Sequence, residues 1–228
     1  MSDSAVTSVI PLKGLRGMIA SNMRRSLDEA AQLTHHAECE LEALLVYKQR
    51  LQEGGTKVSV EDLLADCVVK ALVNHPGLNG RIEGNEIRHY RDVHLCFAIA
   101  LSGNKLVAPA VFNANELTLT ERAGARKSVL ERAKEDGLSV SEMTGGTFTL
   151  SNLGRSRVRF FTPIINLPQL AILGIGETYS RPVENSAGQW EARRFMGLSL
   201  TFDHRAVDGG PAAEFLSDLC EVIERAGD

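Results

Sequence analysis

The chain has 228 residues, of which 43% are hydrophobic and 24% are charged, as is typical of a globular protein with a sizeable core. The net charge of −4 gives no reason to expect nucleic acid or a membrane surface as a partner, and no apolar run approaches the roughly 18 residues of a membrane span. The first residues lack the basic and apolar regions of a secretory signal, so we expect a cytoplasmic protein.

Helical periodicity dominates the first third of the chain. We interpret residues 1–13 as an N-terminal arm and residues 14–228 as a single domain. Apolar residues recur at helical spacing from Leu15, again near 41–52, and again from Ser59. Ser59 and Asp62 form a plausible capping pair, and His75-Pro76-Gly77 ends the third helix.

Strand patterns are frequent in the rest of the chain. A helix is predicted near 118–136, and the closing helix has Pro211 in its first turn. Strands are predicted over 93–100, 106–111, 147–152, 170–175 and 195–202. This mixture predicts one α/β domain, or more loosely an α+β domain.

The cysteines and histidines give no sign of a metal site. Cys39, Cys67, Cys96 and Cys220 are widely scattered among apolar or small residues, so we expect buried, reduced thiols. The pair His35-His36 with Glu38 lacks both an H-E-x-x-H pattern and a third ligand, so no metal is expected there.

The segment Phe202-Asp203-His204-Arg205-Ala206-Val207-Asp208-Gly209-Gly210 carries the most chemistry. It connects the last predicted strand to the closing helix, and rigid scaffolds often display catalytic groups on such connections. A histidine followed four residues later by an acid and then by two glycines suits a base on a constrained turn. The alternative is a polar loop with an exposed His204.

A second segment, Gly145 to Gly154, predicts a turn and a strand, and it ends in Ser151-Asn152. The Ser151 hydroxyl could donate a hydrogen bond where negative charge develops during a reaction. A turn-forming Ser-Asn pair at the end of a strand is the commoner use of these residues.

Several motifs together resemble the catalytic domain of dihydrolipoamide acyltransferases from 2-oxo acid or acetoin dehydrogenase complexes. The matching motifs occur in the same order and with similar spacing, over about residues 11–225. They are Arg16-Gly17-Met18-Ile19-Ala20, His75-Pro76-Gly77-Leu78-Asn79, Ser151-Asn152-Leu153-Gly154, the run from Phe161 to Pro168, and Asp203-His204-Arg205-Ala206-Val207-Asp208-Gly209. The resemblance implies a fold like chloramphenicol acetyltransferase, with a mixed central sheet flanked by helices and trimers whose active sites lie between subunits.

The resemblance also implies roles for three residues. His204 would be the general base that removes the thiol proton of coenzyme A, or of dihydrolipoamide in the reverse direction. The thiolate would then attack the acyl thioester directly, without an acyl-enzyme. Ser151 would donate to the oxyanion, and Asp208 would hold the loop through an ion pair, with Arg16 as the candidate partner.

Coenzyme A, as a substrate, is expected to contact Asn152, Arg155 and Ser156, with further contacts near Lys48, Ser59 and Gly176. Three arginines alternate in this loop, Arg155, Arg157 and Arg159, where relatives more often have small residues. The three arginines would bind phosphate, or they would form a row of side chains that is exposed to solvent or contacts another subunit.

The partners follow from the same resemblance. Since no lipoyl domain is visible in the sequence, the lipoyl group is expected in trans, from lipoyl domains of a dehydrogenase complex. We expect isolated homotrimers rather than a 24-subunit cube, because an apolar C-terminal tail is not seen. The alternatives are a non-catalytic assembly core and a small-molecule acetyltransferase of the chloramphenicol acetyltransferase type. A short, uncharged acyl group is the default expectation.

Overall fold

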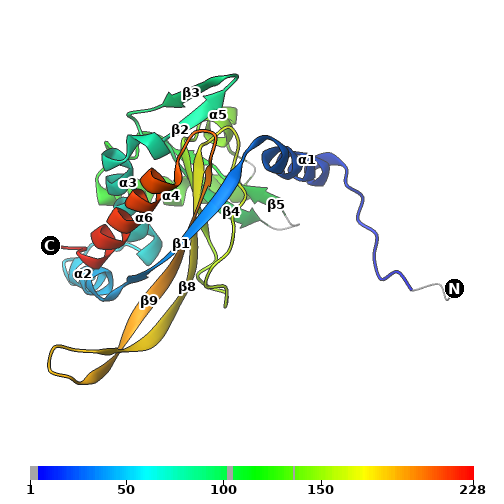
Figure 1. Ribbon diagram of the computed structural model, residues 1–228. Helices are drawn as coiled ribbons and strands as arrows, with labels where there is room; N and C mark the ends of the chain where they lie inside the picture. Colours follow the sequence, from blue (N-terminus) through cyan, green and yellow to red (C-terminus); the bar gives the residue numbers. More distant parts are fainter. Residues whose placement is uncertain (1–4, 102–104, 136) are drawn as a thin grey trace.

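A mixed β-sheet forms the centre of the molecule (Figure 1). The computed structural model describes residues 5–101, 105–135 and 137–228. The strand order is β1-β9-β8-β7-β4-β5, and β6 also pairs with β4. β7 is parallel to both of its neighbours, whereas the pairs β8–β9 and β1–β9 are antiparallel. The predicted fold class, a mixed sheet flanked by helices, is therefore confirmed.

The strands of this sheet are β1 Gln32–Glu40, β4 Leu95–Leu101, β5 Lys105–Val107, β6 Ala110–Val111, β7 Phe148–Asn152, β8 Ala171–Glu184 and β9 Trp190–Asp203. A separate hairpin is formed by β2 Gly80–Glu83 and β3 Glu86–His89. The helices are α1 Gly14–Glu29, α2 Glu42–Glu53, α3 Val60–Asn74, α4 Leu119–Lys134, α5 Val140–Thr144 and α6 Gly209–Glu224, with a short 3-10 turn at Pro76–Leu78.

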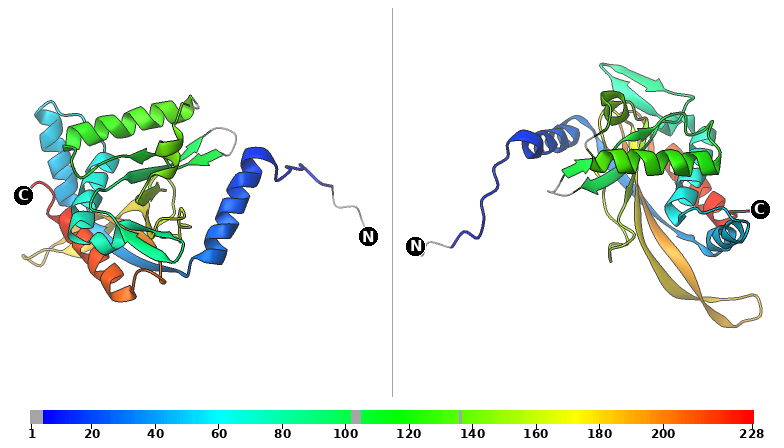
Figure 2. Two further views of the ribbon diagram at one scale, coloured as in Figure 1. Left: turned by 90° about the horizontal axis from the view of Figure 1, so that it is seen from above. Right: turned by 180° about the vertical axis from the view of Figure 1, so that it is seen from behind.

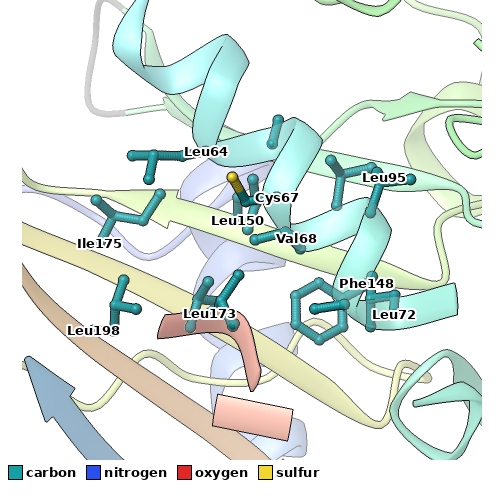
Figure 3. Packing of buried hydrophobic residues seen from close by; sticks show 14 of the residues in the cluster. Leu64, Cys67, Val68, Leu72, Leu95, Phe148, Leu150, Leu173, Ile175 and Leu198 are labelled. Atoms are coloured by element: carbon teal, nitrogen blue, oxygen red, sulfur yellow. The ribbon is translucent and has the colours of Figure 1, made fainter. Parts of the chain in front are cut away.

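The main core lies between one face of the sheet and the helices α3, α4 and α6. Side chains from α3 meet apolar side chains from four neighbouring strands (Figure 3). Full burial of each such aliphatic side chain contributes roughly 1.5–3 kcal/mol. The contacting residues include Leu64, Cys67, Val68 and Leu72 of α3, and Leu95, Phe148, Leu150, Leu173, Ile175 and Leu198 of the strands.

The chain between β7 and β8, residues 153–170, crosses the opposite face of the sheet and is called the crossing segment below. The sheet provides room for this crossing because it carries glycine there. A Cβ atom at Gly174 would lie 2.7 Å from the Phe161 ring, and Cβ atoms at Gly176 and Gly197 would collide with the carbonyl oxygen of Arg159. The crossing segment can therefore lie flat on β8 and β9.

α1 is joined to this crossing segment at its C-terminal end. The Ser26 hydroxyl donates to the Ile165 carbonyl oxygen at 2.6 Å, and the Ile165 N–H donates to the Gln32 side chain at 3.1 Å. Residues 5–13 are extended and exposed, and together with α1 they project away from the rest of the chain (Figure 2).

The β8–β9 hairpin extends beyond the body of the sheet (Figure 1). The predicted strands at 170–175 and 195–202 are correct but too short, because the outer half of the hairpin is polar and contains Pro182. Stacking supports this outer half, since the Arg159 guanidinium lies 3.5 Å from the ring centre of Tyr179 and that of Arg181 lies 3.8 Å from Phe195.

The predicted burial of the thiols is confirmed for Cys39, Cys67 and Cys96, whereas Cys220 is only half-buried. Burial raises the pKa of Cys67 to about 12 and that of Cys96 to about 11, so both stay protonated at neutral pH. In the described ranges, no helix is long and apolar enough to cross a membrane, and no group of three or more His, Cys, Asp or Glu side chains could hold a metal ion.

Candidate active site

Ser151 lies on β7 and faces a cavity of about 410 Å³ on the side of the sheet away from α3. Within the described part of the chain, the Ser151 hydroxyl has no hydrogen-bond partner, so it is available to a bound molecule. The other lining residues come from α1, α5, the strands β4, β5, β7 and β8, the residue after β5, and the crossing segment. They are Met18, Ile19, Asn22, Met23, Ala98, Leu106, Val107, Ala108, Met143, Thr149, Phe161, Pro163, Ile164, Asn166 and Ile172.

Asn152, the next residue, faces the other side of the sheet, because side chains alternate along a strand. Its Nδ2 atom donates to Glu61 Oε1 at 3.1 Å, and its Oδ1 atom accepts the Gly154 N–H at 2.8 Å. Asn152, Arg155 and Ser156 line a groove of about 420 Å³. Three of the residues predicted to contact coenzyme A therefore lie in one place.

Ser59 is connected to this groove through a polar network. Its hydroxyl accepts the Asp62 N–H at 3.1 Å and receives a hydrogen bond from Arg126 Nη2 at 3.2 Å, which confirms the predicted capping pair. Arg126 also pairs with Glu61 at 2.7 Å and Asp62 at 2.6 Å. Burial alone would raise the pKa of Asp62, but hydrogen bonds from Arg126 and Ser59 outweigh it, and the pKa is lowered.

Arg126 and Glu61 line the groove but were not identified from the sequence. Each lies on a helix, among many other charged residues of the same kind. The only signal available was that Glu61 lies inside the Ser59–Asp62 cap, and this signal does not point to a ligand. Their role depends on the packing of α3 beside α4, which sequence periodicity does not give.

His204 lies in the connection between β9 and α6, which is tied to the start of β1. The His204 N–H donates to the Ala31 carbonyl oxygen at 2.8 Å. The preceding Asp203 is fully buried, and it accepts the Ala31 N–H at 3.2 Å and a hydrogen bond from Arg205 at 2.6 Å. These bonds hold the backbone of His204, while its side chain remains 46% exposed.

Asp208 occupies the N-cap position of α6, but its side chain makes no capping hydrogen bond. The Asp208 carboxylate is 85% exposed, and its Oδ1 atom lies 3.9 Å from Nδ1 of His204, which is too far for a hydrogen bond. The role of Asp208 in holding the loop stays a prediction.

Ser151 and His204 do not meet within one chain. Ser151 pairs with Gly174 of β8, and Gly174 pairs with Ser199 of β9, so Ser151 is level with Ser199. His204 follows Ser199 by five residues, which is roughly 17 Å along the strand direction, and β9 lies two strand spacings, or about 10 Å, from β7. Neither side chain is long enough to cross that separation.

The remaining predicted positions differ in their surroundings. Lys48 lies on α2 and lines neither the cavity nor the groove. Gly176 is buried beneath the backbone of Arg159, so this geometry does not support contact with coenzyme A. Of the three arginines, Arg155 lines the groove, whereas Arg159 stacks on Tyr179 and lies 3.6 Å from Glu177. Arg157 is exposed.

Comparison with known proteins places these observations in a family. The model of the 2-oxoacid dehydrogenases acyltransferase (catalytic domain) family matches residues 4–228. The chain is 38% identical over 221 residues to the dihydrolipoyllysine-residue acetyltransferase component of the acetoin cleaving system of Bacillus subtilis, covering 94% of this chain and 55% of that protein. It is 36% identical over 222 residues to the mitochondrial dihydrolipoyllysine-residue succinyltransferase component of the 2-oxoglutarate dehydrogenase complex of Saccharomyces cerevisiae, covering 94% and 47%. The chain thus spans about half the length of the curated relatives it matches.

Solved structures agree with this relationship. A probable dihydrolipoamide acetyltransferase from Listeria monocytogenes superposes with a TM-score of 0.88 at 29% identity, covering 97% of this chain and 96% of that one. Dihydrolipoamide acetyltransferase from Azotobacter vinelandii superposes with a TM-score of 0.87 at 27% identity, covering 98% and 93%. Chloramphenicol acetyltransferase, at 16% identity and a TM-score of 0.56, shares the fold.

The Azotobacter structure was determined to study the roles of a serine, a histidine and an asparagine in the catalytic mechanism. In that protein the histidine follows the serine by 52 residues, and the asparagine follows the histidine by four. Here His204 follows Ser151 by 53 residues, and Asp208 follows His204 by four. The spacing is nearly the same, with aspartate in place of asparagine. From the match over nearly its whole length, the chain belongs to the 2-oxoacid dehydrogenase acyltransferase family, in its catalytic domain.

Proposed function

We propose that this chain transfers a short acyl group between coenzyme A and a dihydrolipoyl group. The observation that carries the proposal is the position of Ser151, whose unpartnered hydroxyl lines an uncharged cavity while its neighbour Asn152 lines a polar groove on the other face. A reaction between an acyl-bearing thiol and a nucleotide-bearing thiol needs two such environments close to one hydroxyl donor.

His204 acts as the general base in this proposal. Its imidazole takes the proton of the attacking thiol, and the sulfur forms a bond to the thioester carbon. The tetrahedral oxyanion accepts a hydrogen bond from Ser151. When the original carbon–sulfur bond of the thioester breaks, the leaving thiolate takes the proton back from His204. Free thiols and free imidazoles have ordinary pKa values near 8.5 and 6.5, so proton transfer from thiol to imidazole is uphill by about 2.7 kcal/mol. This is a modest cost for catalysis by a positioned base.

The two substrates occupy opposite faces of the sheet. Arg155 in the groove is the candidate to bind the phosphates of coenzyme A, because a guanidinium matches phosphate in charge and geometry. Asn152, Ser156 and Ser59 complete the polar surroundings, and Lys48 remains a peripheral candidate. The uncharged cavity receives the acyl group together with the lipoyl chain, which a lipoyl domain of a dehydrogenase complex presents in trans.

The active site forms between subunits of a homotrimer. This follows from the separation of Ser151 and His204 within one chain, since both can act on one thioester only if they come from different subunits. An isolated trimer is expected over a 24-subunit cube, and the mass in solution distinguishes the two assemblies. The cytoplasm remains the expected compartment.

The first test measures acyl transfer from acyl-coenzyme A donors to free dihydrolipoamide, with wild type beside His204→Ala. Transfer that depends on His204 supports the proposed function. If the wild-type protein is folded and correctly assembled but no donor gives transfer, the proposal is wrong and a non-catalytic assembly core becomes the better explanation.

The second test mixes two inactive variants, Ser151→Ala and His204→Ala, after dissociation and reassembly. If each site takes its serine and its histidine from different subunits, about one quarter of the sites in random trimers regain both residues. Activity should therefore return to roughly that fraction of wild type. Mixed trimers that stay inactive would show that both residues act within one chain.

A further inference from the structure

The cavity in front of Ser151 has an uncharged lining. Among the described residues that form it, none carries an ionisable side chain, and the polar side chains are Asn22, Thr149, Ser151 and Asn166. Thr149 already donates its hydroxyl hydrogen to Gln169 Oε1 at 2.6 Å. The residues of this chain that line the cavity thus offer amides and hydroxyls, but no countercharge, to whatever it binds.

The walls of the cavity are held in place by packing and hydrogen bonds. The Phe161 ring lies on Gly174, where a Cβ atom would be only 2.7 Å from it. The α1 wall is joined to the crossing segment through the bond between Ser26 and the buried Ile165.

The groove on the other face, in contrast, is lined by charged groups. Arg126 is engaged by Glu61 and Asp62, and Arg155 lines the groove. Asn152, which follows Ser151, points to this polar side. The sheet therefore separates the charged residues of the groove from the cavity that receives the acyl group.

We infer that this cavity selects short acyl groups without charge and rejects acyl groups that end in a carboxylate. An ionised carboxylate in the cavity loses its hydration and finds no cation among these lining residues. The Arg205 guanidinium beside His204, which the neighbouring subunit would bring to the site, already pairs with Asp203. Burial of the carboxylate is therefore strongly unfavourable. A methyl or small branched alkyl end meets the side chains of Met23, Phe161 and Ile172 without such a penalty. This inference rests on the proposed function and names the substrate class that the names of the relatives, acetyl and succinyl, leave open.

The test compares acetyl-, propionyl-, isobutyryl- and succinyl-coenzyme A as donors to dihydrolipoamide, using the assembled protein. We expect kcat/KM for succinyl-coenzyme A to be at least about 100-fold below the best uncharged donor. Transfer from succinyl-coenzyme A that equals or exceeds the others would overturn the inference and leave the proposed acyltransferase activity intact. Failure with all four donors would instead reject the proposed function, and the inference with it.

A charge placed on the wall provides a second test. Asn22 is exposed and lines the cavity, whereas its neighbour Ser21 is exposed on the same helix and does not line it. Asn22→Arg should raise the ratio of succinyl to acetyl transfer by about 10-fold, since it supplies the missing cation. Ser21→Arg adds the same charge and should leave the ratio unchanged. Equal ratios in both variants, with acetyl transfer retained, would contradict the assignment of this cavity to the acyl group.

Discussion

Ser151 and Asn152 are consecutive residues of β7 whose side chains lie on opposite faces of the sheet. Ser151 lines the uncharged cavity, and Asn152 donates to Glu61 in the polar groove. A strand places successive side chains on opposite sides without any special backbone conformation. Two adjacent residues can therefore face two different environments, as the proposed transfer between two substrates requires.

Ser151→Ala should lower kcat by about 100- to 1,000-fold, because one hydrogen-bond donor to the oxyanion is lost. The hydroxyl has no other partner among the described residues, so folding stability should change little. KM for coenzyme A should stay nearly constant, since the interaction forms only in the transition state. Steady-state kinetics check both values, with Thr149→Val as the control for a buried hydroxyl in the same strand. An unchanged kcat would make Ser151 a structural residue.

Asp208→Asn should change kcat/KM by less than about threefold, because an exposed carboxylate contributes little through its charge. The side chain is 85% exposed and makes no capping hydrogen bond. The Azotobacter protein carries an asparagine at the corresponding spacing. Asp208→Ala serves as the comparison, since it removes hydrogen-bonding capacity as well as charge. A large loss in the asparagine variant would instead establish the ion pair expected from the sequence.

Arg155→Ala should raise KM for coenzyme A by about 5- to 10-fold with a small effect on kcat, because the loss concerns a phosphate contact distant from the reacting carbon. Arg157→Ala is the matched control, as Arg157 is exposed and does not line the groove. Initial rates at varied coenzyme A concentration distinguish the two. Equal effects of both substitutions would indicate a general contribution of positive charge rather than a specific contact.

Periodicity and turn residues in the sequence were sufficient to predict most of the core. The closing helix buries Phe215, Leu216, Leu219 and Ile223, and it was predictable because one apolar face of a helix produces a clear pattern. β1, over Gln32–Glu40, was missed. Its residues are mostly polar, and it becomes a strand through pairing with β9 along its whole length. Such long-range pairing leaves no local signal.

The site was predictable where a reactive side chain lies within a short recognisable motif, as Ser151 and His204 each do in separate motifs. It was not predictable where tertiary packing creates the surroundings. Gly176 was assigned to coenzyme A, but it lies under the Arg159 backbone because the crossing segment needs a residue without a side chain there. Arg126 reaches the groove only because α4 packs beside α3.

Asp62→Asn should destabilise the fold at neutral pH by about 1–2 kcal/mol, through loss of a helix cap and of a largely buried pair with Arg126. Since the folded pKa of Asp62 is lowered, its stabilising contribution is complete above the unfolded pKa of about 3.9 and disappears as pH falls through the folded value. The stability difference between wild type and variant should therefore be constant from pH 7 to pH 5 and shrink below pH 4. Urea unfolding followed by circular dichroism at several pH values measures it.

The control for the Asp62 substitution is Glu121→Gln at the α4 capping box, where the carboxylate is exposed and pairs with Thr118. This control variant should lose less stability than Asp62→Asn from pH 7 to pH 5, because an exposed cap exchanges its hydrogen bonds with water more easily than a buried one. A stability difference between wild type and Asp62→Asn that grows as the pH falls below 4 would contradict the assigned direction of the pKa shift at Asp62.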